Sequence, residues 1–374
     1  MNSKERMKAT MSGKSVDRIP VMCQLSLGHI YKNAGLAALE YWFTPEGFAE
    51  GYIRMAENYG FDGILVSKAT GDPAQYKKAI HQENTHEGKL IIFEDGKQFI
   101  CPPDDYPRLL NNSPVINKEI SQVSPDDIHL VSSAYELYPW YGNILDIVLA
   151  RKKDTLSIHG EIGTSFEAFL RTFGSFESGL MAIMDDKEKS REIIARINQN
   201  CLVYAIEQCR RGIDALKLSS PFAGAGFISA DMYEEFVLPY EKAIIDTVHR
   251  EFGIPCYIHT CGAIGDRLEL MLESGTDGLE CLDPPPLGTV TLSDAVNRIG
   301  NRCFIKGNLD SVNELTKSPG EIRKIAEERI AIGRMAKGYI LSSACSVSPD
   351  VPPENILALG EVVKNNSQGN AYEK

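Results

Sequence analysis

Short apolar runs alternate with amphipathic stretches along most of the chain. Each run is rich in aliphatic and β-branched side chains and ends near a glycine or polar residue, which is typical of a buried strand that enters a loop. Because the runs are apolar almost throughout, they predict parallel strands buried on both faces. Eight such runs are present, at residues 21–25, 61–67, 154–160, 214–220, 254–262, 278–283, 302–310 and 338–345.

Helix signals stand between these runs. Thr44 is a capping residue directly before Pro45, and Gly60 follows Tyr59, so we expect a helix that begins at Thr44-Pro45 and ends near Tyr59. Residues 124–127 form a capping box with proline and predict another helix start. Later stretches place apolar residues three and four positions apart, which indicates helices with one buried face.

One segment departs from the alternation of strand and helix. Residues 90–93 and 98–101 are apolar and flank a turn that contains Gly96, which predicts a β-hairpin inserted between strands two and three. Eight strands that alternate with helices predict an α/β fold, a single (β/α)8 TIM barrel over residues 1–374. A doubly wound open sheet is the alternative, but no GxGxxG loop follows the first strand.

The charge and the composition of the chain indicate which kinds of binding partner to expect. The formal net charge is −12 and no long basic run is present, which argues against nucleic acid or an anionic membrane surface as a partner. No apolar run approaches the roughly 20 residues of a membrane span. The polar first residues lack the apolar core of a signal peptide, so we expect a cytoplasmic protein with reduced thiols.

Nine cysteines are present, and most lie inside apolar runs. Free cysteine often behaves as a small buried hydrophobic residue. We therefore expect seven of them to be packing residues, namely Cys23, Cys101, Cys201, Cys209, Cys256, Cys281 and Cys303.

The fifth run carries the strongest chemical signal. It ends in His259-Thr260-Cys261-Gly262, and side chains two positions apart on a strand face the same way. An imidazole and a thiolate placed side by side can hold one metal ion, most commonly zinc. The alternative is a core histidine beside an inert buried cysteine.

The rest of the barrel decides between these alternatives, because catalytic groups of such barrels gather at the carboxyl ends of the strands. Cys345 lies at the end of the eighth strand, and Glu280 and Asp283 lie on or just after the sixth. We therefore predict that His259, Cys261 and Cys345 hold a catalytic zinc with an open fourth position. Glu280 is expected to fill that position until substrate displaces it; the alternative for Glu280 is a surface or salt-bridged acid.

With these residues in place, the chain resembles the uroporphyrinogen decarboxylase superfamily. The resemblance extends from DRIPV at the start through FDGILV, IHTCG and IKGNLD to SVSPDVPPEN. It implies a (β/α)8 barrel. The decarboxylase branch carries an arginine-rich stretch after the first strand, where this chain has residues 24–29 without arginine, and an aspartate after the second strand, where it has residues 67–69, Ser-Lys-Ala.

The second branch contains the corrinoid-dependent methyltransferases, such as methylcobamide:coenzyme M methyltransferase. These are similar in carrying a His-x-Cys pair and a later cysteine as zinc ligands, which His259, Cys261 and Cys345 match one by one. The sequence after strand six, LECLDPPP, departs from the branch, so the acceptor need not be coenzyme M.

The resemblance implies a zinc-dependent methyltransferase that moves a methyl group between a corrinoid and a small-molecule donor or acceptor, which we expect to be a thiol. The chain has no DxHxxG motif of its own, so the corrinoid is expected on a separate protein. No catalytic residue beyond the metal ligands is predicted, and corrinoid-binding residues are not identified. The alternatives are a tetrapyrrole decarboxylase and a non-catalytic zinc-containing binding barrel.

Overall fold

The computed structural model describes residues 1–369, and its centre is a curled sheet of seven parallel strands. The strands stand side by side in chain order, so each pairs with the next one along the sequence. Seven of the eight predicted strands are thus present: β1 (Gly63–Val66), β6 (Ser157–Gly163), β7 (Ala215–Ser219), β8 (Cys256–Thr260), β9 (Gly278–Cys281), β10 (Phe304–Leu309) and β11 (Gly338–Ser343). All are buried along most of their length.

The predicted first strand, residues 21–25, is not a regular strand, and the prediction of eight is wrong in this respect. It makes two isolated parallel bridges, Val21 with Leu341 and Leu25 with Val347. The N–H of Val21 donates to the buried carboxylate of Asp62 at 2.9 Å instead of to a neighbouring strand. The N–H of Asp62 in turn donates to the carbonyl of Val21, so the segment contacts both β11 and the start of β1.

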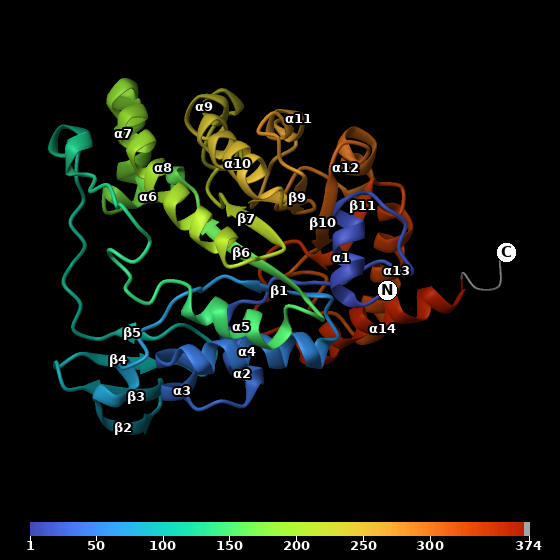
Figure 1. The fold of residues 1–374 in the computed structure, drawn as a ribbon, viewed down its shortest axis with the longest axis horizontal. Helices are drawn as coiled ribbons and strands as arrows, with labels where there is room; N and C mark the ends of the chain where they lie inside the picture. Colours follow the sequence, from blue (N-terminus) through green and yellow to red (C-terminus); the bar gives the residue numbers. More distant parts are fainter. Residues whose placement is uncertain (370–374) are drawn as a thin grey trace.

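Helices lie around this sheet (Figure 1). The predicted helix after Thr44 is confirmed as α4 (Pro45–Tyr59): the Thr44 side chain accepts from Gly47, and Gly60 is left-handed with φ 65°. The capping box at Ser124 also forms, but the helix it opens ends after one turn, η3 (Pro125–Asp127). The other helices are α1 (Ser3–Met11), α2 (Leu27–Ala34), α3 (Ala38–Phe43), α5 (Asn143–Lys152), α6 (Ser165–Thr172), α7 (Phe176–Asp185), α8 (Lys187–Arg210), α9 (Ala230–Phe236), α10 (Leu238–Phe252), α11 (Leu268–Leu272), α12 (Leu292–Ile299), α13 (Pro319–Gly333) and α14 (Pro353–Gly369).

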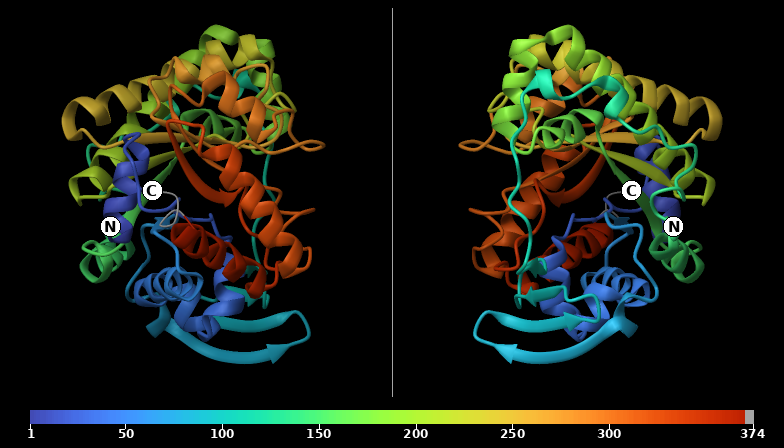
Figure 2. Two further views of the ribbon diagram at one scale, coloured as in Figure 1. Left: turned by 90° about the vertical axis from the view of Figure 1, so that its right-hand side faces the viewer. Right: turned by 90° about the vertical axis from the view of Figure 1, so that its left-hand side faces the viewer.

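The predicted hairpin belongs to a larger antiparallel sheet of four strands. Its strands are β2 (Ala79–Thr85), β3 (Gly88–Phe93), β4 (Gln98–Cys101) and β5 (Arg108–Leu109), and a one-turn helix, η1 (Gln75–Lys78), precedes them. The sheet lies at one end of the molecule, apart from the parallel sheet (Figures 1 and 2). Phe43 of α3 packs against Phe93 and Phe99, which anchors the sheet to the helices.

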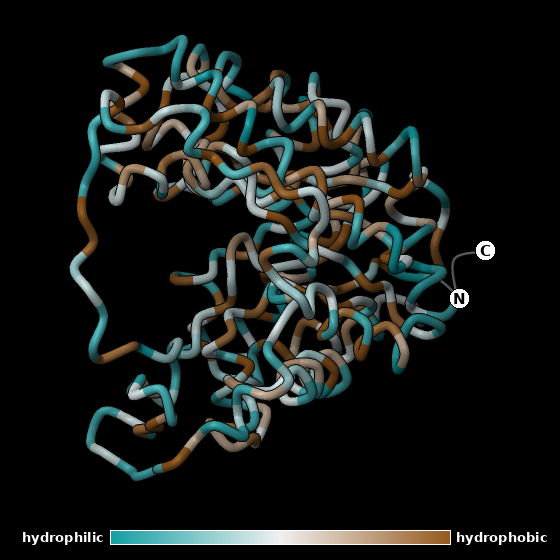
Figure 3. The backbone as a smooth tube through the Cα atoms, turned by 60° about the vertical axis from the view of Figure 1, so that its left-hand side comes forward, coloured by the Kyte–Doolittle hydropathy of each residue, from teal (hydrophilic) through white to brown (hydrophobic). Residues whose placement is uncertain are grey.

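A long connection leaves β5 and reaches η2 (Ile120–Gln122) on the opposite side of the molecule. Part of this connection runs apart from the rest of the chain (Figures 1 and 3). It is tied down at the far end, where the N–H of Lys118 donates to the carbonyl of Phe173. Among the described residues, no helix is long and apolar enough to cross a membrane.

Candidate metal centre

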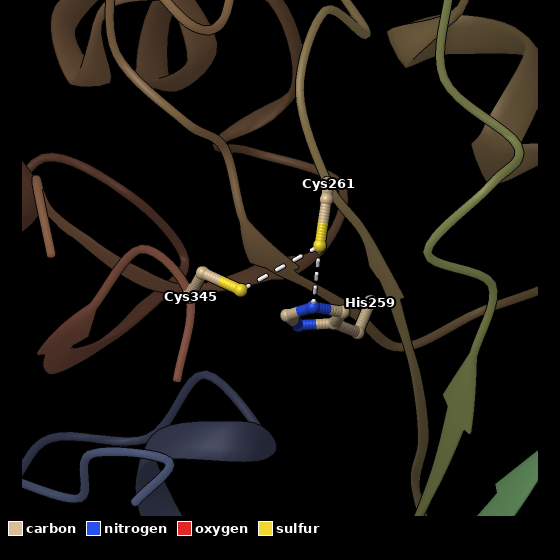
Figure 4. A group of neighbouring side chains, drawn as sticks. All are labelled: His259, Cys261 and Cys345. Carbon is tan, nitrogen blue, oxygen red and sulfur yellow. Dashed lines mark hydrogen bonds between the residues drawn. The ribbon is translucent and has the colours of Figure 1, made fainter. Parts of the chain in front are cut away.

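Three predicted metal ligands meet at the carboxyl ends of β8 and β11. The Nε2 of His259 lies 3.2 Å from the Sγ of Cys261, and that sulfur lies 3.6 Å from the Sγ of Cys345 (Figure 4). One donor atom from each residue lies within 4.8 Å of the other two. The curl of the sheet therefore brings together residues that are 84 positions apart in the sequence.

The spacing of these atoms suits a tetrahedral metal ion. Zinc–sulfur bonds of about 2.3 Å and zinc–nitrogen bonds of about 2.0–2.1 Å give tetrahedron edges of about 3.8 Å between two sulfurs and about 3.6 Å between sulfur and nitrogen. The edges seen here, 3.6 Å between the sulfurs and 3.2 Å from nitrogen to sulfur, are slightly shorter. A few tenths of an ångström of outward movement would admit the ion.

Glu280, the predicted fourth ligand, lies on the other side of the imidazole. Its Oε2 accepts from the Nδ1 of His259 at 3.0 Å, and the two residues are register partners on β9 and β8. This hydrogen bond leaves Nε2 directed at the cysteines. A carboxylate on the second nitrogen of a metal-binding histidine fixes the ring and raises its basicity, so this position suits an orienting partner.

Two lysines share the Glu280 carboxylate inside the barrel. Lys217 of β7 lies 3.2 Å from Glu280 and 3.3 Å from Glu161, and Lys306 of β10 forms a closer ion pair with Glu280. The side chains of both lysines are fully buried. Burial opposes ionisation of Glu280, but Lys217 and Lys306 outweigh it and hold the pKa of Glu280 well below its ordinary value.

The sequence analysis missed these two lysines. A signal was available, because each lysine is the one charged residue of a buried strand, in ALKLS and FIKGNL. A lone lysine in a strand buried on both faces is costly unless it is paired, so it points to a buried carboxylate nearby.

Mutual contacts shift the pKa values of Cys345 and His259. Contacts with Cys261 lower the pKa of the Cys345 thiol well below its ordinary value. Burial and Lys217 oppose protonation of His259, but its contacts with Cys261 and Cys345 outweigh them and raise its pKa. An imidazolium beside a thiolate is an arrangement in which a metal ion can replace the proton, because metal ligands bind in their deprotonated forms.

A second group of donors adjoins the first. Donor atoms of Cys261, Cys281 and Asp283 lie within 4.8 Å of one another. Asp283 accepts from the N–H of Gly262 at 2.7 Å and from the Cys281 thiol at 3.2 Å. The expectation that Cys281 is only a packing residue is therefore too simple.

A cavity of about 620 Å³ opens close to Cys345 in the chain, at Ser346, although none of the three metal ligands lines it. Its walls include Gln24, Lys68, Tyr106, Glu161 and Ser346, the residue after Cys345. This volume is in the range of small-molecule sites. Lys68 is the one cation among the lining residues, and burial lowers its pKa to about 8.

The chain has relatives in both branches of one family. Residues 101–366, more than half of the chain, match the family model described as uroporphyrinogen decarboxylase (URO-D). A uroporphyrinogen decarboxylase from Legionella pneumophila is 29% identical over 189 residues, 50% of this chain and 51% of that protein. The chain thus spans about half the length of the curated decarboxylases that it matches in this way.

Two further comparisons cover nearly the whole chain. The methylcobamide:CoM methyltransferase MtbA from Methanosarcina acetivorans is 27% identical over 97% of both chains. A solved methyltransferase from Methanosarcina mazei superposes with a TM-score of 0.74 over 98% of this chain and 99% of that one, at 16% identity, which shows a shared fold. The chain therefore belongs to the uroporphyrinogen decarboxylase family, and along its full length it is similar to a methylcobamide:CoM methyltransferase.

Proposed function

We propose that this protein is a zinc-dependent methyltransferase that moves a methyl group between a corrinoid and a small molecule, with a thiol as acceptor. The observation that carries the proposal is the convergence of His259, Cys261 and Cys345 at the carboxyl end of the barrel, beside a small-molecule cavity. The similarity to a methylcobamide:CoM methyltransferase over 97% of the chain supports the same class of reaction.

His259, Cys261 and Cys345 would hold the zinc, and a zinc ion with thiolate ligands supplies the charge that deprotonates a coordinating thiol near neutral pH. Other residues of the chain orient the histidine and balance the buried charges. Glu280 holds the His259 ring through Nδ1, so that Nε2 stays directed at the cysteines. The fully buried Lys217 and Lys306 balance the charge of Glu280, and Lys217 also pairs with Glu161 at the wall of the cavity.

The cavity selects the substrate. Lys68 places an ammonium over the Phe48 ring, 4.1 Å from its centroid, and it forms no ion pair with any residue that the structure describes. An anionic group on the thiol substrate would fit this position, because a partly desolvated cation gains most from an ionic partner. We propose that the corrinoid is carried by a separate protein that approaches the open side of this cavity, and that residues 1–374 act as one catalytic domain.

A tetrapyrrole decarboxylase is the second candidate, because the family model carries that description. The lining of the cavity argues against it. A substrate with many carboxylates requires several cations, whereas the lining residues include Lys68 as a cation and Glu161 and Glu167 as acids. We expect no coproporphyrinogen from uroporphyrinogen, and its formation would favour this second candidate.

The zinc content of purified protein tests the proposal. Native protein should contain about one zinc per chain, and Cys261→Ser and Cys345→Ser should each lose most of it. Cys201→Ser is the matched control, because Cys201 lies on α8, outside both groups of donor atoms. If both site variants keep the native zinc content, the ligand assignment is wrong. If all four proteins lack zinc, the proposed zinc chemistry fails and the decarboxylase candidate is favoured.

A further inference from the structure

We infer that the small-molecule substrate is an aromatic carboxylate, whose ring binds in a second cavity, lined by aromatic side chains, that adjoins the first at Lys68. The inference rests on the proposed function for the reaction, but the binding site does not depend on a metal. The observations that carry it are the walls of the second cavity, its junction with the first, and the charges that face it.

The second cavity, the aromatic cavity, has a volume of about 420 Å³. Its walls come from α3, α4, β4 and the loop after β1, elements that lie together at the lower end of the molecule in Figure 1. Five of its lining residues are aromatic: Trp42, Phe43, Phe48, Phe99 and Tyr106. The Trp42 ring lies 5.6 Å from the Tyr106 ring and 5.8 Å from the Phe48 ring, between centroids. A flat aromatic group bound among these rings gains offset and edge contacts, which an aliphatic group of the same size does not.

The two cavities meet at Lys68 and Tyr106, which line both of them. The first cavity extends from this junction to Ser346, the residue after Cys345. A substrate can therefore place its ring in the aromatic cavity and its carboxylate at the junction. The group that gives or takes the methyl then lies in the first cavity.

The charges that face the aromatic cavity favour a single negative charge on the ligand. Lys68 is the one cation that lines it, and the Lys68 N–H donates to the Tyr52 hydroxyl at 2.9 Å, which fixes the backbone there. Asp72 is the one acid, but its carboxylate pairs with Lys78 at 3.6 Å and accepts from the N–H of Ala74 at 2.8 Å. One carboxylate would pair with Lys68, whereas a second negative charge would face Asp72.

Packing of the antiparallel sheet explains only some of these aromatic rings. Phe43 contacts Phe93 and Phe99 at centroid distances of 5.0 and 5.3 Å, which anchors the sheet. Lys68, by contrast, lies over the Phe48 ring on the wall of a cavity. An ammonium without an ionic partner, set among aromatic rings, matches both parts of an aromatic carboxylate.

The loop that carries Tyr106 is fixed against α2 at Gly28. A Cβ on Gly28 would lie 2.1 Å from the carbonyl oxygen of Asp104, so this close approach requires glycine. The Tyr106 side chain itself is outside the core, since the residue is 54% exposed. Substitution of Tyr106 therefore changes the wall of both cavities without removing a packed core residue.

Fluorescence titration of the full-length protein as purified tests the binding site. The chain has two tryptophans, so Trp140→Phe leaves Trp42, in the wall of the aromatic cavity, as the single reporter. Phenylacetate should change the Trp42 emission and bind about 10–100-fold more tightly than acetate, the gain expected from burial of one ring. Equal affinity for phenylacetate and cyclohexylacetate would overturn the aromatic class of ligand.

Variants in the same background locate the ligand. Lys68→Met should weaken phenylacetate binding about 10–100-fold. Tyr106→Ala should weaken it about 3–10-fold, and Tyr106→Phe should restore it. Tyr138→Ala is the matched control, because Tyr138 is 49% exposed and lines neither cavity. Phenylacetate binding that is unchanged in both Lys68→Met and Tyr106→Ala would overturn the site.

A substrate with the ring separates this inference from the proposed function. In methyl transfer with methylcobalamin, 2-mercapto-3-phenylpropionate should have a KM about 10–100-fold below that of 2-mercaptopropionate, which lacks the ring. Tyr106→Ala should reduce this gain through KM, with kcat retained. Equal KM values for the two thiols would overturn the inference and leave the proposed function intact. Phenylacetate binding as described, with no methyl transfer involving any thiol, would overturn the proposed function and leave the aromatic site intact.

Discussion

Replacement of Glu280 by glutamine tests whether the carboxylate orients His259 through a hydrogen bond to its Nδ1 or binds the metal directly. The change keeps the size of the side chain and removes its charge. Lys306 then loses its carboxylate partner and retains Ser342 at 3.3 Å, while Lys217 retains Glu161 at 3.3 Å. One fully buried ammonium is therefore left uncompensated.

The expected cost follows from that uncompensated charge. Removal of one partner from a buried ion pair costs about 3–5 kcal/mol. A chain of 374 residues has an unfolding entropy of about 0.8 kcal/mol/K, so the melting temperature should fall by about 4–6 °C. Loss of an orienting partner of a metal-binding histidine should also weaken zinc binding about 10–100-fold.

Differential scanning calorimetry of zinc-free protein measures the first effect, and competition with a zinc chelator measures the second. Glu273→Gln is the matched control, because Glu273 is exposed and its change should cost within about 0.5 kcal/mol. Adding Lys306→Met to Glu280→Gln should restore much of the lost stability, since it removes the unpaired charge. An unchanged melting temperature in Glu280→Gln would refute the buried-charge reasoning.

Two further predictions concern buried groups with shifted pKa values. Burial lowers the pKa of Lys68 to about 8, so Lys68 should bind the carboxylate of mercaptopropionate below that pH and release it above. In calorimetric titrations, mercaptopropionate should bind about ten- to a hundred-fold more tightly than neutral mercaptoethanol, as expected for a charge-assisted bond. This preference should vanish in Lys68→Met, and a preference that survives would remove Lys68 from the site. Burial raises the pKa of Glu241, which accepts from Ser220 and Tyr233, to about 7. The native state therefore binds the extra proton, and the resulting stabilisation is complete below pH about 4.5 and is lost as pH rises through 7. The melting temperature of native protein relative to Glu241→Gln should fall by about 3 °C between pH 5 and 8, whereas a constant difference would contradict this.

Much of the fold could be predicted from the sequence because apolar runs report burial directly. The seven regular strands of the parallel sheet coincide with predicted runs, and the caps at Thr44 and Gly60 set the bounds of α4. The first run failed as a strand because the Asp62 carboxylate takes the N–H of Val21, a contact across 41 positions that periodicity does not report. The capping box at Ser124 formed as predicted, yet local signals did not set the length of the helix.

The candidate site was predictable to the extent that it follows strand alternation and barrel closure. Alternation places His259 and Cys261 side by side, and closure brings Cys345 to them. The position of Cys281 could not be predicted, because a left-handed conformation at a non-glycine residue depends on tertiary contacts and leaves no pattern in the sequence.

Methyl transfer with methylcobalamin is the measurement that tests the central claim most directly. Native zinc-loaded protein, a small thiol and methylcobalamin should give demethylation of the cobalt, followed by its absorbance change, and the rate should fall sharply in His259→Ala and in metal-free protein. The same assay in reverse, from the methylated thiol to cob(I)alamin, covers the other direction of transfer. Zinc-dependent transfer in either direction is the predicted result; absence of transfer in both directions, with zinc fully bound and every thiol tried, would contradict the account.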